Sequence, residues 1–461
     1  MSTSPSPQGW PGGLKSYFAE HRVLETYPTG WNRWWMLILT VFATIVSFYE
    51  FGFSALLPLW LPTLHFTRAE FGWWLTCAVF LSAFSAMAGG PLADRHGRVV
   101  VIDVCLVAII ILTFCNLLMS GFWSFAVIRA CMNLVAGLMW GALGGLTRDM
   151  SPRLSRGAAF GLLTVGAVLC QFLWNFIPGM TLPIFHTWQS QIVIMGIISI
   201  ILYIPVLLWL KDLSPKLRMM VIESETTGEA FESGETEAEG PGTAMQAFSQ
   251  LLGKWQSWVL VVGVVAFLTT AITIQSFGPL MFTEAFKYSP AQAATFTSYF
   301  WLLNLIVLVP SGWVSDKLRM RKPISLILTC VVIALLVWWL FHFMPPLAPA
   351  ALSVVTILLG GLTAFAFIPW CALYSEYVED ISAALQATGW SFFQMIYRIW
   401  IAFSAPLLLW VAATYGWRTW MFWDFIATIL YLVSLIVVPG YWKRAKAAVG
   451  QGAEPAAASG R

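Results

Sequence analysis

Charged side chains are scarce in this 461-residue sequence: they make up 10% of it, while hydrophobic residues make up 59%. A soluble domain carries about a quarter charged residues and about half apolar ones. Here the uncharged residues arrive in blocks of about 20 or more, long enough to cross a bilayer core of roughly 30 Å. The composition therefore argues against a soluble domain and predicts a polytopic membrane protein.

The sequence also lacks the residue sets of common enzymes and metal proteins. Its seven cysteines all fall in or beside apolar blocks, and an odd number without clustering in loops argues against a disulfide framework or a zinc site. None of the five histidines is paired at metal-ligand spacing, and there is no nucleotide-binding glycine loop or catalytic-triad spacing. Residues 1–33 are polar, and the first apolar block is too long for a cleavable signal peptide. We expect no catalytic residue, no metal, no cofactor and no nucleic acid.

Counting the apolar blocks predicts an all-α protein with twelve transmembrane helices. They cover residues 34–61, 70–92, 99–118, 122–146, 157–181, 188–210, 256–282, 290–314, 323–343, 348–374, 384–411 and 418–441. Alternate loops are rich in Lys and Arg, for example the loop with Arg95 and Arg98, whereas the others are short and poor in both. By the positive-inside rule, the basic loops and both termini are cytoplasmic.

One long polar stretch, residues 211–255, divides the helices into six and six. Its middle, "ESETTGEAFESGETEAEGPG", is acidic and glycine-rich, which is typical of a flexible linker. The predicted organisation is therefore a cytoplasmic N-terminal segment (1–33), a six-helix bundle (34–210), a cytoplasmic acidic linker (211–255), a second six-helix bundle (256–441) and a cytoplasmic tail (442–461).

The two halves echo each other in sequence. "GGPLADRHGR" follows the second apolar block and "SGWVSDKLRMRK" follows the eighth, with Asp94 and Asp316 at an offset of 222 residues. Gly161 and Gly389, near the fifth and eleventh blocks, match at an offset of 228. These echoes indicate a duplicated six-helix unit. Secondary transporters are commonly built this way, with the substrate site where the halves meet near the bilayer midplane.

The loop between the second and third blocks carries a patterned set of glycines and charges. Gly90, Leu92, Ala93, Asp94, Arg95, Gly97 and Arg98 fill the pattern Gly-x-Leu-Ala-Asp-Arg-x-Gly-Arg. With twelve spans and the repeat, this motif resembles the major facilitator superfamily, and the resemblance covers essentially the whole chain. It implies two pseudo-symmetric bundles in the lipid bilayer of the cell (inner) membrane, transport by alternating access, and function as a monomer.

The same resemblance implies a conformational gate at the cytoplasmic edge. In the family, this charge cluster holds the halves together in one state and opens during the cycle. "RDMSPRLSRGAAFG" (148–161) resembles a second cytoplasmic signature. A purely topogenic loop would explain the arginines but not Asp94 between two glycines. The expected gate residues are Gly90, Asp94, Arg95, Gly97, Arg98, Arg156, Asp316 and Lys317.

Three ionisable residues fall deep inside apolar blocks: Glu50, Arg129 and Arg398. A charge at bilayer depth costs roughly 3 kcal/mol or more, so it marks a transport pathway or a buried partner by default. At about 1.5 Å per helical residue, all three lie roughly 20 to 24 Å from the cytoplasmic surface. We therefore expect them to share one layer of the membrane.

Polar side chains recur at helical spacing around these charges. In the family that the sequence resembles, helices 1, 4, 7 and 10 line a central cavity, and helices 2, 5, 8 and 11 form its walls. That assignment implies that the polar stripes converge on substrate. The candidate substrate-binding residues are Arg129, Asn133, Gln171, Asn175, Gln394, Tyr397 and Arg398.

Glu50 and Arg129 are the candidates for proton coupling. Arg129 is similar to the arginine of the family's helix 4 signature Arg-x-x-x-Gly, which is linked to proton coupling, with Asn133 in place of the glycine. "FYEFGFSALLP" (48–58) resembles the acidic helix 1 motif of the aromatic-acid and metabolite proton symporters. A carboxylate partly withdrawn from water beside an anion can exchange a proton. The alternative is that Glu50 and Arg129 simply pair within the N-terminal half.

Two deep arginines favour an anionic substrate, because a guanidinium holds a carboxylate through two parallel hydrogen bonds. Arg398 has no obvious acidic partner in its own half, where Asp424 is the nearest candidate. We therefore predict a transporter for uptake of a small carboxylate, with protons as the coupling ion. The alternative is a proton-coupled exporter or exchanger of amphipathic or aromatic compounds, favoured by the aromatic residues and by the helix 4 arginine, Arg129. A sensor or a membrane enzyme finds little support.

Overall fold

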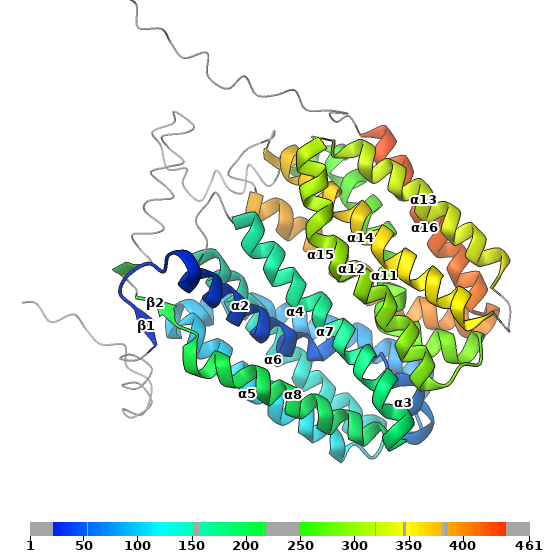
Figure 1. Cartoon of the computed structure of the whole chain (residues 1–461), viewed down its shortest axis with the longest axis horizontal. Coiled ribbons are helices and arrows are strands. Elements are labelled where there is room, and N and C mark those ends of the chain that lie inside the picture. Colours follow the sequence, from blue (N-terminus) through cyan, green and yellow to red (C-terminus); the bar gives the residue numbers. More distant parts are fainter. Residues whose placement is uncertain are drawn as a thin grey trace, which may run out of the picture.

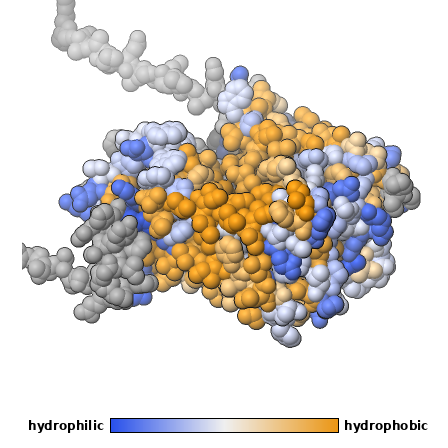
Figure 2. All heavy atoms as spheres, turned by 60° about the horizontal axis from the view of Figure 1, so that its bottom comes forward, coloured by the Kyte–Doolittle hydropathy of each residue, from blue (hydrophilic) through white to orange (hydrophobic). Residues whose placement is uncertain are grey.

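The computed structural model describes residues 22–52, 54–150, 156–214, 216–217, 249, 251–318, 320–343, 347–379, 381 and 386–438. Within these ranges, twelve helices are long and apolar enough to cross a membrane, which confirms the predicted number of spans. Figure 2 shows the matching surface: a broad hydrophobic band crosses the middle of the molecule, with hydrophilic residues on either side. Most of the predicted linker lies outside the described residues.

The first half of the chain forms one bundle and the second half another, and the two lie beside each other in Figure 1. The first contains α2 (Gly30–Ser47), η1 (Phe48–Phe51), α3 (Leu57–Thr63), α4 (Arg68–His96), α5 (Arg98–Cys115), η2 (Asn116–Leu118), α6 (Phe122–Asp149), α7 (Arg156–Phe185) and α8 (Trp188–Trp209). The second contains α11 (Trp255–Ala285), α12 (Pro290–Leu318), α13 (Lys322–Phe341), α14 (Pro349–Glu379), α15 (Gln386–Tyr415) and α16 (Trp417–Val437).

Both ends of the described chain lie at the same end of the bundles, which we call the termini face. There β1 (Val23–Leu24) pairs in parallel with β2 (Asp212–Leu213), which follows α8. At the start of α13, the Lys322 ammonium donates to the Val438 carbonyl at 2.7 Å. The opposite end, where α3 leads into α4 and α11 into α12, is called the distal face. The prediction that the termini are cytoplasmic remains a prediction.

The halves contact each other through α4 on α15, α7 on α12 and α3 on α11. Specific contacts gather toward the distal ends of these helices. The Thr76 hydroxyl on α4 donates to the Ala402 carbonyl on α15 at 2.5 Å. The rings of Phe71 and Phe277, on α4 and α11, lie 6.1 Å apart. These contacts join the two bundles near the distal face.

The duplication seen in the sequence recurs in the loops of the distal face. Thr67 and Glu70 form a capping box at the start of α4. Ser289 and Gln292, each 222 residues later, exchange the equivalent hydrogen bonds at the start of α12. The residues two positions before these caps, His65 and Lys287, both have a left-handed backbone, with φ of 53° and 61°. The same turn and the same cap therefore precede α4 in the first half and α12 in the second, which confirms the pseudo-symmetric fold.

The first span is not the continuous helix over 34–61 that the hydropathy predicts. It stops at η1, and helical structure resumes only at Leu57. Pro58 lies in the first turn of α3, where its missing N–H leaves no helical hydrogen bond unmade. Gly52 lies against the Trp174 indole so closely that a Cβ at this position would overlap it. The break places the short segment that carries Glu50 among the other helices of the N-terminal bundle.

A close approach between α4 and α6 supports this region and gives a first prediction. A Cβ on Gly137 of α6 would overlap the backbone carbonyl of Ser82 on α4. We therefore expect Gly137→Ala to destabilise the protein by about 1–3 kcal/mol through overpacking. Gly144 of the same helix has open space at its Cβ position, so Gly144→Ala is the matched control. It should be neutral or slightly stabilising, because alanine favours the helix.

Thermal unfolding in detergent checks this pair of variants. A lower midpoint for Gly137→Ala with an unchanged or higher midpoint for Gly144→Ala is the expected outcome. Equal midpoints for the two variants would contradict the close helix approach.

Candidate functional site

Glu50, at the break in the first span, is the centre of the candidate site. Its side chain is buried, with 1% exposed. One carboxylate oxygen accepts a hydrogen bond from the Ser82 hydroxyl of α4 at 3.2 Å. The other, Oε1, is buried without a hydrogen-bond partner in the part of the chain that the structure describes. Because a buried polar atom normally has a partner, this oxygen has capacity for a proton or a ligand.

Arg129 of α6 joins the two parts of the broken span. It is buried, with 1% exposed, and its guanidinium donates to the backbone carbonyl of Glu50. The same guanidinium lies over the Trp60 ring of α3, with its carbon 5.9 Å from the ring centroid. Arg129 thus satisfies a carbonyl that the helix break leaves open. The expected contact between Arg129 and Glu50 exists, and its hydrogen bond goes to the Glu50 backbone carbonyl.

Helix α7 adds a layer of polar side chains beside the break. The Ser54 hydroxyl donates to Asn175 at 3.4 Å, and the Asn175 amide donates to the Gln171 carbonyl at 2.8 Å. The amide nitrogen and oxygen of the Gln171 side chain are buried without hydrogen-bond partners among the described residues, and so is the indole nitrogen of Trp174. These groups can all bind a polar ligand or water.

Asn133, the remaining candidate of this half, is buried and donates to the Arg129 carbonyl one turn earlier in α6 at 2.9 Å. Its amide therefore braces its own helix. Among the candidates of the N-terminal half, Arg129, Gln171 and Asn175 surround the break, while the amide nitrogen of Asn133 is used locally.

The C-terminal half presents Arg398, on α15, to this site. Arg398 is half-buried and interacts electrostatically with Glu50 across the boundary between the halves. The described residues contain no direct ion pair between them. Asp424, the acidic partner considered from sequence, instead lies buried on α16 beside Thr273 of α11. The acid with which Arg398 interacts electrostatically is therefore Glu50, in the other half.

The other two candidates on α15 differ in their surroundings. Tyr397 is half-buried beside Arg398, and its ring stacks on Phe393 with centroids 5.9 Å apart. Phe393 in turn contacts Trp370 of α14, at 5.4 Å between ring centroids. Gln394 is exposed. An aromatic cluster thus extends along α14 and α15 toward Arg398.

Sequence reasoning missed Ser82, which holds the Glu50 carboxylate. Serine is common in membrane helices, so the residue carries no signal of its own in the sequence. It also missed that Arg129 would contact the backbone of the first span, because the hydropathy gave no sign of the break.

The expected gate on the termini face is described in part. The Arg98 guanidinium pairs with Asp149 and also donates to the Gly145 carbonyl, both on α6 of the same half. Gly97 has a φ of 95°, which lets α5 begin directly after α4. Arg95 and Lys317 are exposed, and Lys317 lies over the Trp313 ring at 4.8 Å. The surroundings of Gly90 and the side chains of Asp94, Arg156 and Asp316 lie outside what the structure describes.

Comparison with known proteins gives one family model that matches most of the chain, and two relatives of low identity. The sequence model of the Major Facilitator Superfamily matches residues 36–405. A gallate transporter from Pseudomonas putida is 20% identical over 322 residues, which cover 66% of this chain and 70% of that protein. A probable chloroplastic anion transporter from Oryza sativa subsp. japonica is 24% identical over 245 residues, covering 51% of this chain and 46% of that protein.

Solved transporters share the fold. The crystal structure of a D-xylose–proton symporter superposes with a TM-score of 0.64 at 13% identity, covering 88% of this chain and 98% of that chain. A bacterial homolog of the human lysosomal transporter Spinster gives a TM-score of 0.63 at 15% identity, covering 89% and 98%. At these identities the likeness concerns the fold. The matched proteins are all named as transporters. This agrees with the prediction of a multi-pass protein of the cell membrane.

Proposed function

Because the chain belongs to the major facilitator superfamily, we propose that it carries a small organic anion together with a proton, by alternating access. In this proposal the termini face is cytoplasmic, as the positive-inside rule favours, and transport runs from the distal face to the termini face. The anion is a carboxylate. Protons are the coupling ion.

The observation that carries the proposal is the electrostatic interaction of Arg398 on α15 with the buried Glu50 of the other half. A charged arginine at bilayer depth is costly unless a partner or ligand compensates it. Since Arg398 makes no direct ion pair with Glu50, its guanidinium can receive a substrate carboxylate through two parallel hydrogen bonds. Such a carboxylate would bridge the halves at the level where the repeats meet.

Glu50 is the proposed proton carrier. Burial in a low-dielectric surrounding disfavours a carboxylate, and a bound anion nearby disfavours it further. Binding of the substrate anion therefore promotes protonation of Glu50, and protonation removes a repulsion that would oppose binding. Arg129 contributes by holding the broken span in place through its contacts with the Glu50 carbonyl and Trp60.

The names of two relatives support the class of substrate. One is called a gallate transporter and the other a probable anion transporter. Gallate is an aromatic carboxylate, and the aromatic cluster that leads to Arg398 suits a planar ring. We therefore place aromatic carboxylates first among the candidate substrates.

A thermal-shift panel tests the substrate class, because a ligand that binds the folded state raises its melting temperature. We expect stabilisation by an aromatic carboxylate, weaker stabilisation by small aliphatic carboxylates, and no effect of sugars or cationic drugs. Uptake of the stabilising compound into proteoliposomes then establishes transport. Stabilisation by cations or sugars alone would contradict the proposal, and efflux without uptake would support an exporter.

A further inference from the structure

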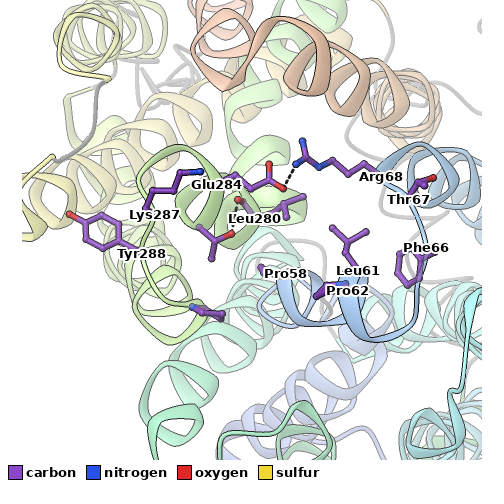
Figure 3. Close-up of a pocket in the computed structure, with 12 residues that line it drawn as sticks. Pro58, Leu61, Pro62, Phe66, Thr67, Arg68, Leu280, Glu284, Lys287 and Tyr288 are labelled. Carbon is purple, nitrogen blue, oxygen red and sulfur yellow. Dashed lines mark hydrogen bonds and ion pairs between the residues drawn. The ribbon is translucent and has the colours of Figure 1, made fainter.

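A cavity of about 580 Å³ lies between the two halves at the distal face (Figure 3). Its N-terminal wall comes from α3 and the loop into α4, and its C-terminal wall comes from the end of α11 and the loop into α12. A volume of roughly 300–1,000 Å³ is the range of small-molecule sites. The cavity belongs to neither half alone and is separate from the Glu50 site.

Two cations and one carboxylate meet in this cavity. Arg68 of α4 pairs with Glu284 of α11, with 2.6 Å between guanidinium nitrogen and carboxylate oxygen. The other oxygen of Glu284 accepts a hydrogen bond from the Trp417 indole at 2.7 Å. Lys287 also interacts electrostatically with Glu284. The cluster therefore has an excess of one positive charge, and the Arg68–Glu284 pair joins the two halves.

The pair is accessible to a solute. The Arg68 side chain is 36% exposed and that of Glu284 is 23% exposed. The charges lie above an apolar wall that includes Pro58, Leu61 and Pro62 of α3. Figure 3 shows Arg68 and Glu284 meeting across the cavity, with Lys287 on the same side as Glu284. Cations beside an apolar wall fit an organic anion, whose carboxylate and hydrocarbon part each find a matching surface.

Lys287 occupies a backbone conformation that lysine rarely adopts, with a φ of 61°. A non-glycine residue in this region costs of order 1 kcal/mol, and such strain concentrates at ligand sites. The equivalent position in the first half holds His65. A lysine therefore stands at the cavity rim where glycine or asparagine would suit the turn better.

We propose that this cavity is the site where an organic carboxylate first binds on the distal face, with Lys287 and Arg68 as its cations. The substrate carboxylate replaces Glu284 on Arg68, and this exchange breaks the ion pair between the halves. Arrival of substrate thereby loosens the closed distal face. This inference rests on the proposed carboxylate transport and adds a second site to it.

The proposal is tested by measuring the KM for carboxylate transport from each face of the membrane separately. The protein is reconstituted into proteoliposomes with a C-terminal tag. An external protease cleaves the tag only when the termini face points outward, so the cleaved fraction gives the orientation of the protein. Lys287→Gln should raise the KM for carboxylate presented to the distal face about fivefold, because the loss of one partly exposed ion pair weakens binding by about that factor. The KM for carboxylate presented to the termini face should stay that of the parent protein. Lys287→Arg should restore the distal KM.

Glu284→Gln should act in the opposite direction. It removes the competitor of the substrate on Arg68, so the KM at the distal face should fall. Arg418→Gln, at an exposed cation at the start of α16 outside the cavity, is the matched control and should leave both values unchanged. Added salt should raise the distal KM of the parent more than that of Lys287→Gln, because screening weakens exposed charges.

The outcomes separate the two proposals. If the parent moves no carboxylate from either face, the proposed function fails and this site fails with it. If the parent transports carboxylate but Lys287→Gln leaves the distal KM unchanged, or raises both KM values equally, only the distal site is overturned. A rise of the distal KM in both Lys287→Gln and Glu284→Gln would assign the cluster a purely structural role and also overturn it.

Discussion

Arg398→Ala should lose carboxylate binding while the protein still inserts and folds. A guanidinium that holds a carboxylate by two charge-assisted hydrogen bonds accounts for about 3 kcal/mol, which corresponds to an affinity loss of roughly 100-fold. The effect should be this large because Arg398 interacts electrostatically with Glu50 across the boundary between the halves and makes no direct ion pair with it. Thermal-shift titration with the best carboxylate of the panel measures the loss directly.

Two further variants complete this experiment. Arg398→Lys keeps the charge but loses the planar two-point contact, so its affinity should lie between those of the parent and Arg398→Ala. Arg418→Ala removes an exposed arginine outside the site and should bind as the parent does. Unchanged affinity in Arg398→Ala would return Arg398 to a packing or lipid-facing role.

Glu50→Gln should separate carboxylate movement from the proton gradient. Glutamine keeps the shape of the side chain and still accepts the hydrogen bond from Ser82, but it has no group that gains or loses a proton near neutral pH. Exchange of labelled for unlabelled carboxylate should therefore continue, with no dependence on pH. In the parent, a gradient of one pH unit should drive about tenfold accumulation of a monocarboxylate, since this gradient corresponds to about 1.4 kcal/mol.

Accumulation in Glu50→Gln vesicles should stop at equal concentrations on both sides. Ser82→Ala is the matched control, because it removes the hydrogen bond to Glu50 but leaves the titratable group. It should keep accumulation. If Glu50→Gln accumulates carboxylate like the parent under the same pH gradient, Glu50 is not the coupling residue.

The sequence allowed the outline of the fold to be predicted because hydropathy and charge asymmetry are properties of whole segments. Asp94 and Asp316 reveal the duplication at an offset of 222 residues. The same offset relates the capping boxes at Thr67 and Ser289. Those caps were not predicted, although Thr-x-x-Glu and Ser-x-x-Gln at the start of apolar runs are typical of them.

The break at Glu50 could not be predicted from the sequence, because it depends on tertiary contacts. Several other spans contain a proline without breaking, for example α11 with Pro279 and α12 with Pro310. The first span breaks where Gly52 admits the Trp174 indole and Arg129 takes the freed carbonyl. Both partners come from helices far away in sequence, so no local pattern announces them.

In the candidate site, too, some features could be predicted from the sequence and others could not. The depth of Glu50, Arg129 and Arg398 in apolar runs identified them, because charge in such runs is rare. Their partners could not be inferred: Arg398 interacts electrostatically with Glu50 rather than Asp424, and Arg68 pairs with Glu284 across the halves. Arg68 and Glu284 lie at helix ends, where charges are ordinary and carry no signal.

The central claim is that a carboxylate and a proton cross the membrane together. Proteoliposomes that contain the parent protein are prepared without a pH gradient. The stabilising carboxylate is then added to the external medium while the external pH is recorded. The proposal predicts alkalinisation of the medium that starts with uptake, matches it in amount, and disappears in Glu50→Gln. Uptake of the carboxylate without any change in external pH would contradict it.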